Sequence, residues 1–153
     1  MEKWNELCLP DISDTHIRSI LELQYTNYQY NKWMESLLKS FQISNEQFNV
    51  LKILQAEYPN AFSLKEIQKR LPNQTKNTTR LVDKLHKKDL VISNVNPNNK
   101  RQLQIIISKK GLNVLKEIET PFGAFIAKLK STLTTEESKQ LSHLLSKVYK
   151  MED

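Results

Sequence analysis

Glycine and cysteine are both scarce in this sequence of 153 residues. Two glycines are too few for an all-β fold built on tight turns, and they argue against a glycine-rich phosphate-binding loop. The one cysteine, Cys8, cannot form a disulfide within the chain. No stretch approaches the roughly 20 apolar residues that span a bilayer, and the first residues lack the basic start and apolar run of a signal peptide. We therefore expect a cytoplasmic protein.

The residues that commonly carry catalysis or bind metals are scattered along the chain. His16, His86 and His143 lie far apart, without cysteines or carboxylates at the spacing of metal ligands. Asp83 and Asp89 are single acids in a basic segment rather than a catalytic pair, and nothing resembles a nucleophile beside its base. We expect no enzyme activity, no cofactor and no metal site.

The positive charge is concentrated in the middle of the chain. The net charge is +6, but residues 65–101 alone hold ten basic and three acidic residues, a net of +7. The rest of the chain is therefore close to neutral. A polyanion that docks on this block is the plainest interpretation, although a solvated basic face would give the same count.

Apolar residues recur at helical spacing in six segments. The predicted helices cover residues 12–40, 44–58, 63–71, 75–88, 108–129 and 134–148. Capping boxes, in which a Ser or Thr and a Glu or Gln three residues later bond each other's backbone N–H groups, open three of them at Ser44, Ser63 and Thr134. The first helix is unusually long for a small domain, so we expect part of it to pack beyond its own core.

Strands are predicted at 61–62, 90–95 and 103–107, with a turn at 97–99 between the last two. Three helices followed by a β-hairpin, over 44–107, is the order of a winged helix-turn-helix. The predicted fold class is mainly α with a small β-hairpin wing: a winged helix-turn-helix plus a dimerisation region of terminal helices. We expect an N-terminal dimerisation region at 1–43, a DNA-binding lobe at 44–108 and C-terminal dimerisation helices at 109–153.

The helix predicted at 75–88 carries side chains suited to base edges in the major groove. We expect DNA contacts from the start of this helix and the turn before it, namely from Gln74, Thr75, Lys76, Asn77, Thr79 and Arg80. Lys65 and Lys84 are better suited to phosphates, which position the protein without specifying a sequence. Lys100 and Arg101, at the hairpin tip, can reach a neighbouring minor groove or the backbone.

Several short motifs follow one another in a specific order. They are Ser44-Asn45-Glu46-Gln47 with Val50-Leu51, Thr79-Arg80-Leu81-Val82-Asp83-Lys84-Leu85, Leu90-Val91, Asn98-Asn99-Lys100-Arg101 and Ile107-Ser108-Lys109-Lys110-Gly111. In this order and spacing they resemble the MarR-type regulators. The resemblance covers most of the chain and implies a homodimer joined by terminal helices, a palindromic DNA operator, and often a small-molecule or oxidation signal that releases it.

The chain departs from the family pattern at two places. Asp89 replaces a glycine at a position that we expect to adopt the left-handed conformation, which Asp tolerates better than most residues. Asn99 and Lys100 replace the Asp and Arg of the wing, so an ion pair that stiffens the wing is lost while its positive charge remains.

Two further features have competing interpretations. Tyr25, Tyr28 and Trp33 could line a pocket for a small aromatic or amphipathic ligand, but core or dimer packing explains such rings more often. Cys8 could sense oxidation, as a cysteine does in some MarR-type proteins. Because Pro10 follows closely and no tyrosine is near in sequence, we expect an ordinary thiol.

The sequence therefore predicts a homodimeric, sequence-specific regulator of transcription that binds double-stranded DNA and acts as a repressor. The alternative is a winged-helix module that binds a partner protein and never DNA. The outward basic residues disfavour it, because protein interfaces are enriched in aromatic and apolar residues.

Overall fold

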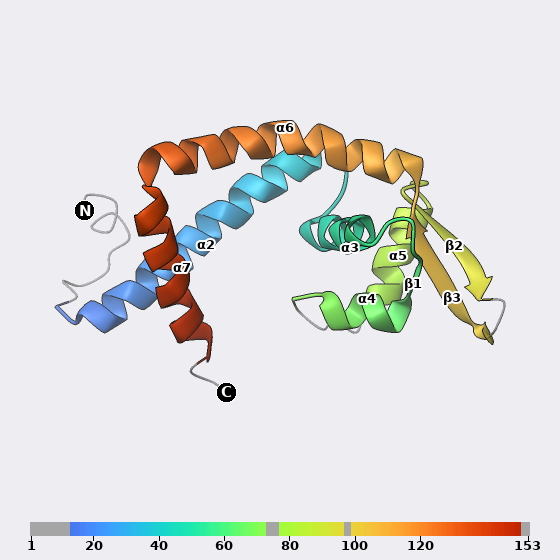
Figure 1. The fold of residues 1–153 in the computed structure, drawn as a ribbon, viewed down its shortest axis with the longest axis horizontal. Coiled ribbons are helices and arrows are strands. Elements are labelled where there is room, and N and C mark those ends of the chain that lie inside the picture. The colour runs from blue at the N-terminus through green and yellow to red at the C-terminus, as the bar shows by residue number, and fades with distance from the viewer. Residues whose placement is uncertain (1–12, 73–76, 97–98, 151–153) are drawn as a thin grey trace. The chain divides into compact units, whose positions relative to one another are not determined.

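The computed structural model describes residues 13–72, 77–96 and 99–150 (Figure 1). For residues 96 and 99–102 the description covers the backbone alone. The chain divides into two compact units, Met1–Asn45 and Glu46–Asp153, which we describe separately.

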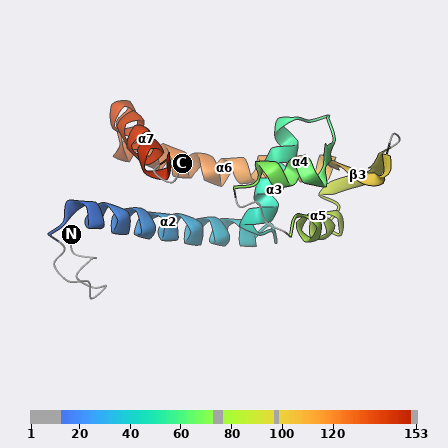
Figure 2. The same cartoon turned by 90° about the horizontal axis from the view of Figure 1, so that it is seen from below.

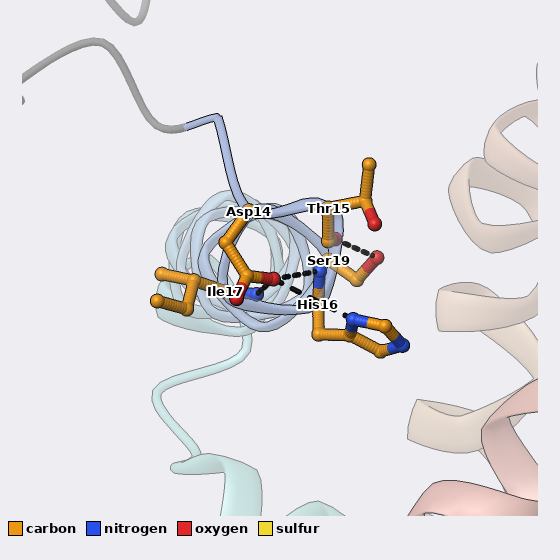
Figure 3. A network of polar contacts seen from close by, with 5 residues as sticks. All are labelled: Asp14, Thr15, His16, Ile17 and Ser19. Atoms are coloured by element: carbon orange, nitrogen blue, oxygen red, sulfur yellow. Dashed lines mark hydrogen bonds and ion pairs between the residues drawn. The ribbon is translucent and has the colours of Figure 1, made fainter.

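The first unit contains one long helix, α2 (Thr15–Lys39), close to the predicted 12–40. The Asp14 side chain caps it by accepting from the backbone N–H groups of His16 at 2.8 Å and Ile17 at 3.3 Å (Figure 3). Only Met34 and Leu38 in its last turns are buried. The first half of α2 exposes three large aliphatic side chains, Ile17, Ile20 and Leu23.

The second unit holds five helices and three strands among its described residues (Figures 1 and 2). In chain order they are α3 (Asn45–Ala56), which starts at the boundary, β1 (Phe62–Ser63), α4 (Leu64–Arg70), α5 (Thr78–His86), β2 (Val91–Asn96), β3 (Asn99–Ile107), α6 (Lys109–Thr132) and α7 (Thr135–Tyr149). This is the predicted order of three helices, a hairpin and two further helices.

The sheet is antiparallel, in the order β1-β3-β2. At its inner end Val91 pairs with Ile107, and Phe62 pairs with Ile105; all four side chains are buried. Leu103 alternates with Ile105 and Ile107 in the sequence, which predicts a half-buried strand with Leu103 on its inner face, and this prediction is wrong for Leu103. Leu103 pairs with Val95 nearer the hairpin tip, and both are exposed because this part of the hairpin extends past the core.

The core forms where α3, α4 and α5 gather beside the sheet at the start of α6 (Figure 2). Its fully buried side chains come from every one of these elements: Val50, Leu51, Leu54, Ile67, Leu85, Ile105, Ile107, Leu115 and Ile118. The predicted capping boxes at Ser63 and Thr134 are both present, and each fixes the first residue of its helix, α4 or α7.

Helix α5 ends in a left-handed turn at Asp89, whose φ is 59°, as predicted. The N–H of Asp89 donates to the carbonyl oxygen of His86 at 2.9 Å, and the N–H of Leu90 donates to that of Leu85 at 3.0 Å. This pair of bonds is the Schellman motif, which satisfies carbonyl groups at a helix end. The chain is thereby turned directly into β2.

The first turn of α6 lies against the backbone of Leu90, which directly follows the left-handed turn at Asp89. A Cβ atom on Gly111 would lie 2.3 Å from the carbonyl oxygen of Leu90 and 2.8 Å from Cγ1 of Ile107. No real Cβ contact is that short, so glycine is required at position 111. Gly123, the other glycine of α6, has open space around its Cα, and an added Cβ would touch nothing within 4 Å.

The two glycines of α6 should therefore respond to alanine in opposite directions. We expect Gly111→Ala to lower the free energy of unfolding by about 1–3 kcal/mol, because the Cβ must displace backbone. Gly123→Ala should raise it by up to about 1 kcal/mol through helix propensity. Denaturant unfolding of both variants checks this. Equal effects of the two substitutions would show that the close approach at Gly111 does not constrain the fold.

The capping box of α4 should make stability depend on pH. The side-chain hydrogen bond from Ser63 Oγ, followed by the bond from the Ser63 N–H, lowers the pKa of Glu66. The charged carboxylate is therefore favoured in the folded chain. Its contribution is complete above the unfolded pKa of about 4.3 and is lost as the pH falls through the lower folded pKa.

We expect Glu66→Gln to be less stable than the native chain at pH 7, and the difference to shrink as the pH falls below 4. The effect should be small because the carboxylate is exposed. Thermal unfolding at both pH values measures it. Glu136→Gln, at an exposed acid that does not cap a helix, is the control. A difference that grows as the pH falls would contradict the sign.

Candidate nucleic-acid interface

Helix α5 is held in place by its neighbours α4 and β2. Helix α4 ends because Leu71 has an extended backbone with ψ 137°, as is usual before a proline, here Pro72. Buried Ile67 and Leu71 anchor α4 in the core and fix the point from which the chain passes to α5. The two helices thus form the helix-turn-helix that the sequence predicted.

Helix α5 has one buried face and one exposed face. Thr78, Val82 and Leu85 recur at helical spacing in the sequence and are buried. On the other side the exposed residues Asn77, Arg80, Lys84 and Lys87 follow one another at helical spacing. We call these four residues the α5 polar stripe. They form one row of an amide, a guanidinium and two ammonium groups.

The start of α5 differs from the prediction. The sequence placed it near residue 75, but Asn77 is the N-cap, with φ −102° and ψ 12°, and the helix begins at Thr78. The first backbone bond, from the Leu81 N–H to the Asn77 carbonyl, confirms this. Local apolar spacing cannot place this boundary, because residues 74–77 are all polar. Gln74, Thr75 and Lys76 lie outside the described residues.

The N-terminus of α5 suits an anion or a polar base edge. The Asn77 side chain makes no capping hydrogen bond, so its amide can serve another partner. The first backbone N–H groups of a helix have no partner within the helix, and the helix dipole makes this end positive. Arg80 lies one turn further on, on the same side.

The other predicted contacts are placed as follows. Lys65 is exposed in the first turn of α4, and Thr79 is exposed on α5 beside the polar stripe. Lys100 and Arg101 lie in β3 between Asn99, which pairs with Asn96, and Leu103, so their backbone lies at an irregularity of the hairpin ladder. Their side chains are outside the description.

Lys87 belongs to the polar stripe but was not among the predicted contacts. It is the C-cap of α5 and lies two turns after Arg80 in the polar stripe. Its helical spacing was the available signal.

Arg70 shows that a basic residue in this region can have a structural role. Its guanidinium lies 4.4 Å from the centroid of the Phe62 ring and 3.4 Å from the Glu57 carboxylate. These contacts link the end of α4 to β1 and to the turn after α3. Its side chain is nevertheless exposed, so exposure alone does not distinguish Arg70 from the cations of the α5 polar stripe.

The three aromatic residues of the predicted ligand pocket are spread around α2. Tyr28 is exposed, whereas Tyr25 and Trp33 are partly exposed, and the Trp33 ring lies 6.1 Å from that of Tyr30. Tyr28 and Trp33 are five residues apart, which places them about 140° apart around a helix. A pocket lined by all three stays a prediction.

Among the residues that the structure describes, no three His, Cys, Asp or Glu side chains are grouped so that they could hold a metal ion. Within the same residues, no helix is long and apolar enough to cross a membrane.

Three comparisons with known proteins agree with this arrangement. Residues 43–103 match the model of the MarR family. The chain is 27% identical over 138 residues to the transcriptional repressor MprA of Escherichia coli, covering 88% of this chain and 78% of the relative.

Two solved structures share the fold. The MarR transcription factor from Planctomyces limnophilus has a TM-score of 0.67 and 26% identity, covering 90% of this chain and 98% of its own. The MepR–DNA complex of S. aureus has a TM-score of 0.76 and 22% identity, and the match covers 85% of this chain and 95% of the MepR chain. The helix-turn-helix, the wing and the matched segment, residues 43–103, are thus similar to those of the MarR family.

Proposed function

We propose that this protein is a sequence-specific DNA-binding regulator of transcription that acts as a repressor. The observation that carries the proposal is the α5 polar stripe, which faces solvent opposite the buried face of the same helix. The similar MprA protein is named a transcriptional repressor, and the MepR neighbour was solved in complex with DNA.

In this proposal α5 enters the major groove. Asn77 and Arg80, at the leading end, read base edges with the preceding Gln74, Thr75 and Lys76. Thr79, Lys84, Lys87 and Lys65 contact the backbone, and Lys100 and Arg101 bring the wing to the adjacent groove. The many cations make affinity depend steeply on salt, because each phosphate contact releases bound counterions.

We also propose a homodimer that binds a palindromic operator. No residue of α7 is buried, and its exposed side chains include Leu141, Leu144, Leu145 and Val148. With Leu129 of α6 and Leu133, the C-cap of α6, this helix lines a groove of about 370 Å³. The apolar start of α2 is exposed as well. A second copy would cover these faces, in line with the proposed division into a central lobe, 44–108, and dimerisation regions at 1–43 and 109–153.

A regulator of this kind acts where the chromosome lies, so we place the protein in the cytoplasm. We further propose that a small aromatic or amphipathic ligand releases it from DNA. Such a ligand would act by shifting the population between two dimer states that differ in the spacing of their α5 helices.

The first experiment selects bound duplexes from a random pool and then measures affinity across salt concentrations. We expect Lys84→Ala to weaken binding to selected and mixed duplexes alike, and to flatten the slope of log affinity against log salt by about 0.9. Arg80→Ala should cost about 1–3 kcal/mol on the selected duplex and relax the selected sequence.

Lys128→Ala, which removes an exposed cation near the far end of α6, is the matched control and should bind as the native chain does. The proposal fails if no duplex is selected, or if Lys84→Ala and Arg80→Ala bind like the control. The protein-binding module of the sequence analysis would then be the better interpretation.

A second experiment tests the dimer by sedimentation. We expect the native chain to sediment as a dimer and Leu144→Glu to shift it towards monomer, because a carboxylate would be buried at the interface. His143→Glu adds the same group on the opposite face of α7 and should leave the dimer intact. Since Leu144 is exposed in the single chain, circular dichroism should show both variants folded. A native monomer would refute this part.

A further inference from the structure

The segment Ile107-Ser108-Lys109-Lys110-Gly111 joins the wing to α6. None of its residues is among the proposed DNA contacts. Ser108 is buried at 8% exposure. Its hydroxyl accepts from the Gly111 N–H at 3.0 Å, which caps α6, and donates to the carbonyl oxygen of Asp89 at 2.6 Å. One hydroxyl therefore has two separate roles, a helix cap and a link to the end of α5.

The link reaches α5 through a single peptide plane. The Asp89 carbonyl, which accepts from Ser108, and the Leu90 N–H belong to the same peptide group, and that N–H donates to the carbonyl of Leu85 in α5. Peptide groups are planar and rigid. The hydroxyl of Ser108 is thus connected to the last turn of α5 by one rigid unit.

Two further contacts hold the same junction. The Ser108 N–H donates to the Leu90 carbonyl at 3.0 Å, and the Lys110 ammonium lies 3.4 Å from the Asp89 carboxylate. The ion pair is exposed and contributes little. The absence of a side chain at Gly111 lets α6 approach this closely. The junction therefore joins the reading helix α5 to the long helix α6.

We propose that Ser108 is a positioning residue that sets which spacing of the two DNA half-sites the dimer accepts. The inference rests on the proposed dimer, in which α6 and α7 join the subunits while α5 reads DNA. If α5 is fixed to α6, the distance between the two α5 helices is fixed as well. A looser junction would let each α5 shift and would tolerate altered spacing.

The cap and the link can be separated by substitution. Ser108→Thr keeps a hydroxyl and both roles. Ser108→Asp keeps the cap, since Asp is a good N-cap, but a carboxylate cannot donate to the Asp89 carbonyl. Ser108→Ala loses both. Thr134→Ala is the matched control, because it removes an equivalent cap from α7. The hydroxyl of Thr134 bonds only with Glu137, within its own capping box.

The experiment measures affinity for a selected operator and for the same operator with one base pair added between its half-sites. We expect the ratio of the two affinities to fall about two- to tenfold in Ser108→Asp and Ser108→Ala, the range that one hydrogen bond supports. Ser108→Thr and Thr134→Ala should keep the native ratio. An unchanged ratio in Ser108→Asp and Ser108→Ala overturns the inference.

Amide hydrogen exchange on the full chain without DNA gives a second readout. The Leu90 amide should exchange faster in Ser108→Asp while the Gly111 amide stays protected, because only the link is lost. If Ser108→Asp does not fold, Ser108→Ala carries the same comparison at Leu90. Native protection of Leu90 in the folded variants overturns the inference. If the native chain selects no duplex, the proposed function fails. The exchange rate of the Leu90 amide still shows whether the hydrogen bond from Ser108 to the Asp89 carbonyl holds the end of α5.

Discussion

The carbonyl oxygen of Leu90 occupies the space that any side chain at residue 111 would need. Because a Cβ there would lie 2.3 Å from that oxygen, α6 reaches the end of α5 only through glycine. Leu90 follows the left-handed residue Asp89 and immediately precedes β2, so this one approach orients three elements together. The positions of α5, of the β2–β3 wing and of α6 all depend on this close approach.

The features that the sequence predicted well are those set by local physics. The two faces of α5 follow from helical period, and the capping boxes at Ser63 and Thr134 follow from side chains three residues apart. Each needs only neighbouring residues, which a sequence displays directly.

The features that it missed depend on residues far apart in the chain. Leu103 and Val95 continue the apolar alternation of the hairpin, yet they are exposed because the core ends before they are reached. The start of α5 is set by how α4 and the sheet position the chain, and the polar residues before Thr78 carry no periodic signal. Period alone cannot show where a core ends.

The candidate site illustrates the same limit for charge. Arg70 and Arg80 are equivalent in a count of basic residues and both are exposed, but Arg70 contacts the Phe62 ring and the Glu57 carboxylate, while Arg80 lies in the α5 polar stripe. A net charge of +7 over residues 65–101 therefore indicates the region that binds a polyanion. The residues that contact it can be separated from structural ones only when their neighbours are known.

Helix α7 extends this argument from the single chain to its assembly. A helix of 15 residues is marginal by itself in water, and most of the stability of protein helices comes from burying an apolar face. No residue of α7 is buried within its own chain, although Leu141, Leu144 and Leu145 recur at helical spacing. The capping box at Thr134 starts the helix but cannot supply that burial. The exposed apolar face of α7 therefore supports the proposed dimer, in which Ser108 would tie α5 to α6, the helix that precedes α7.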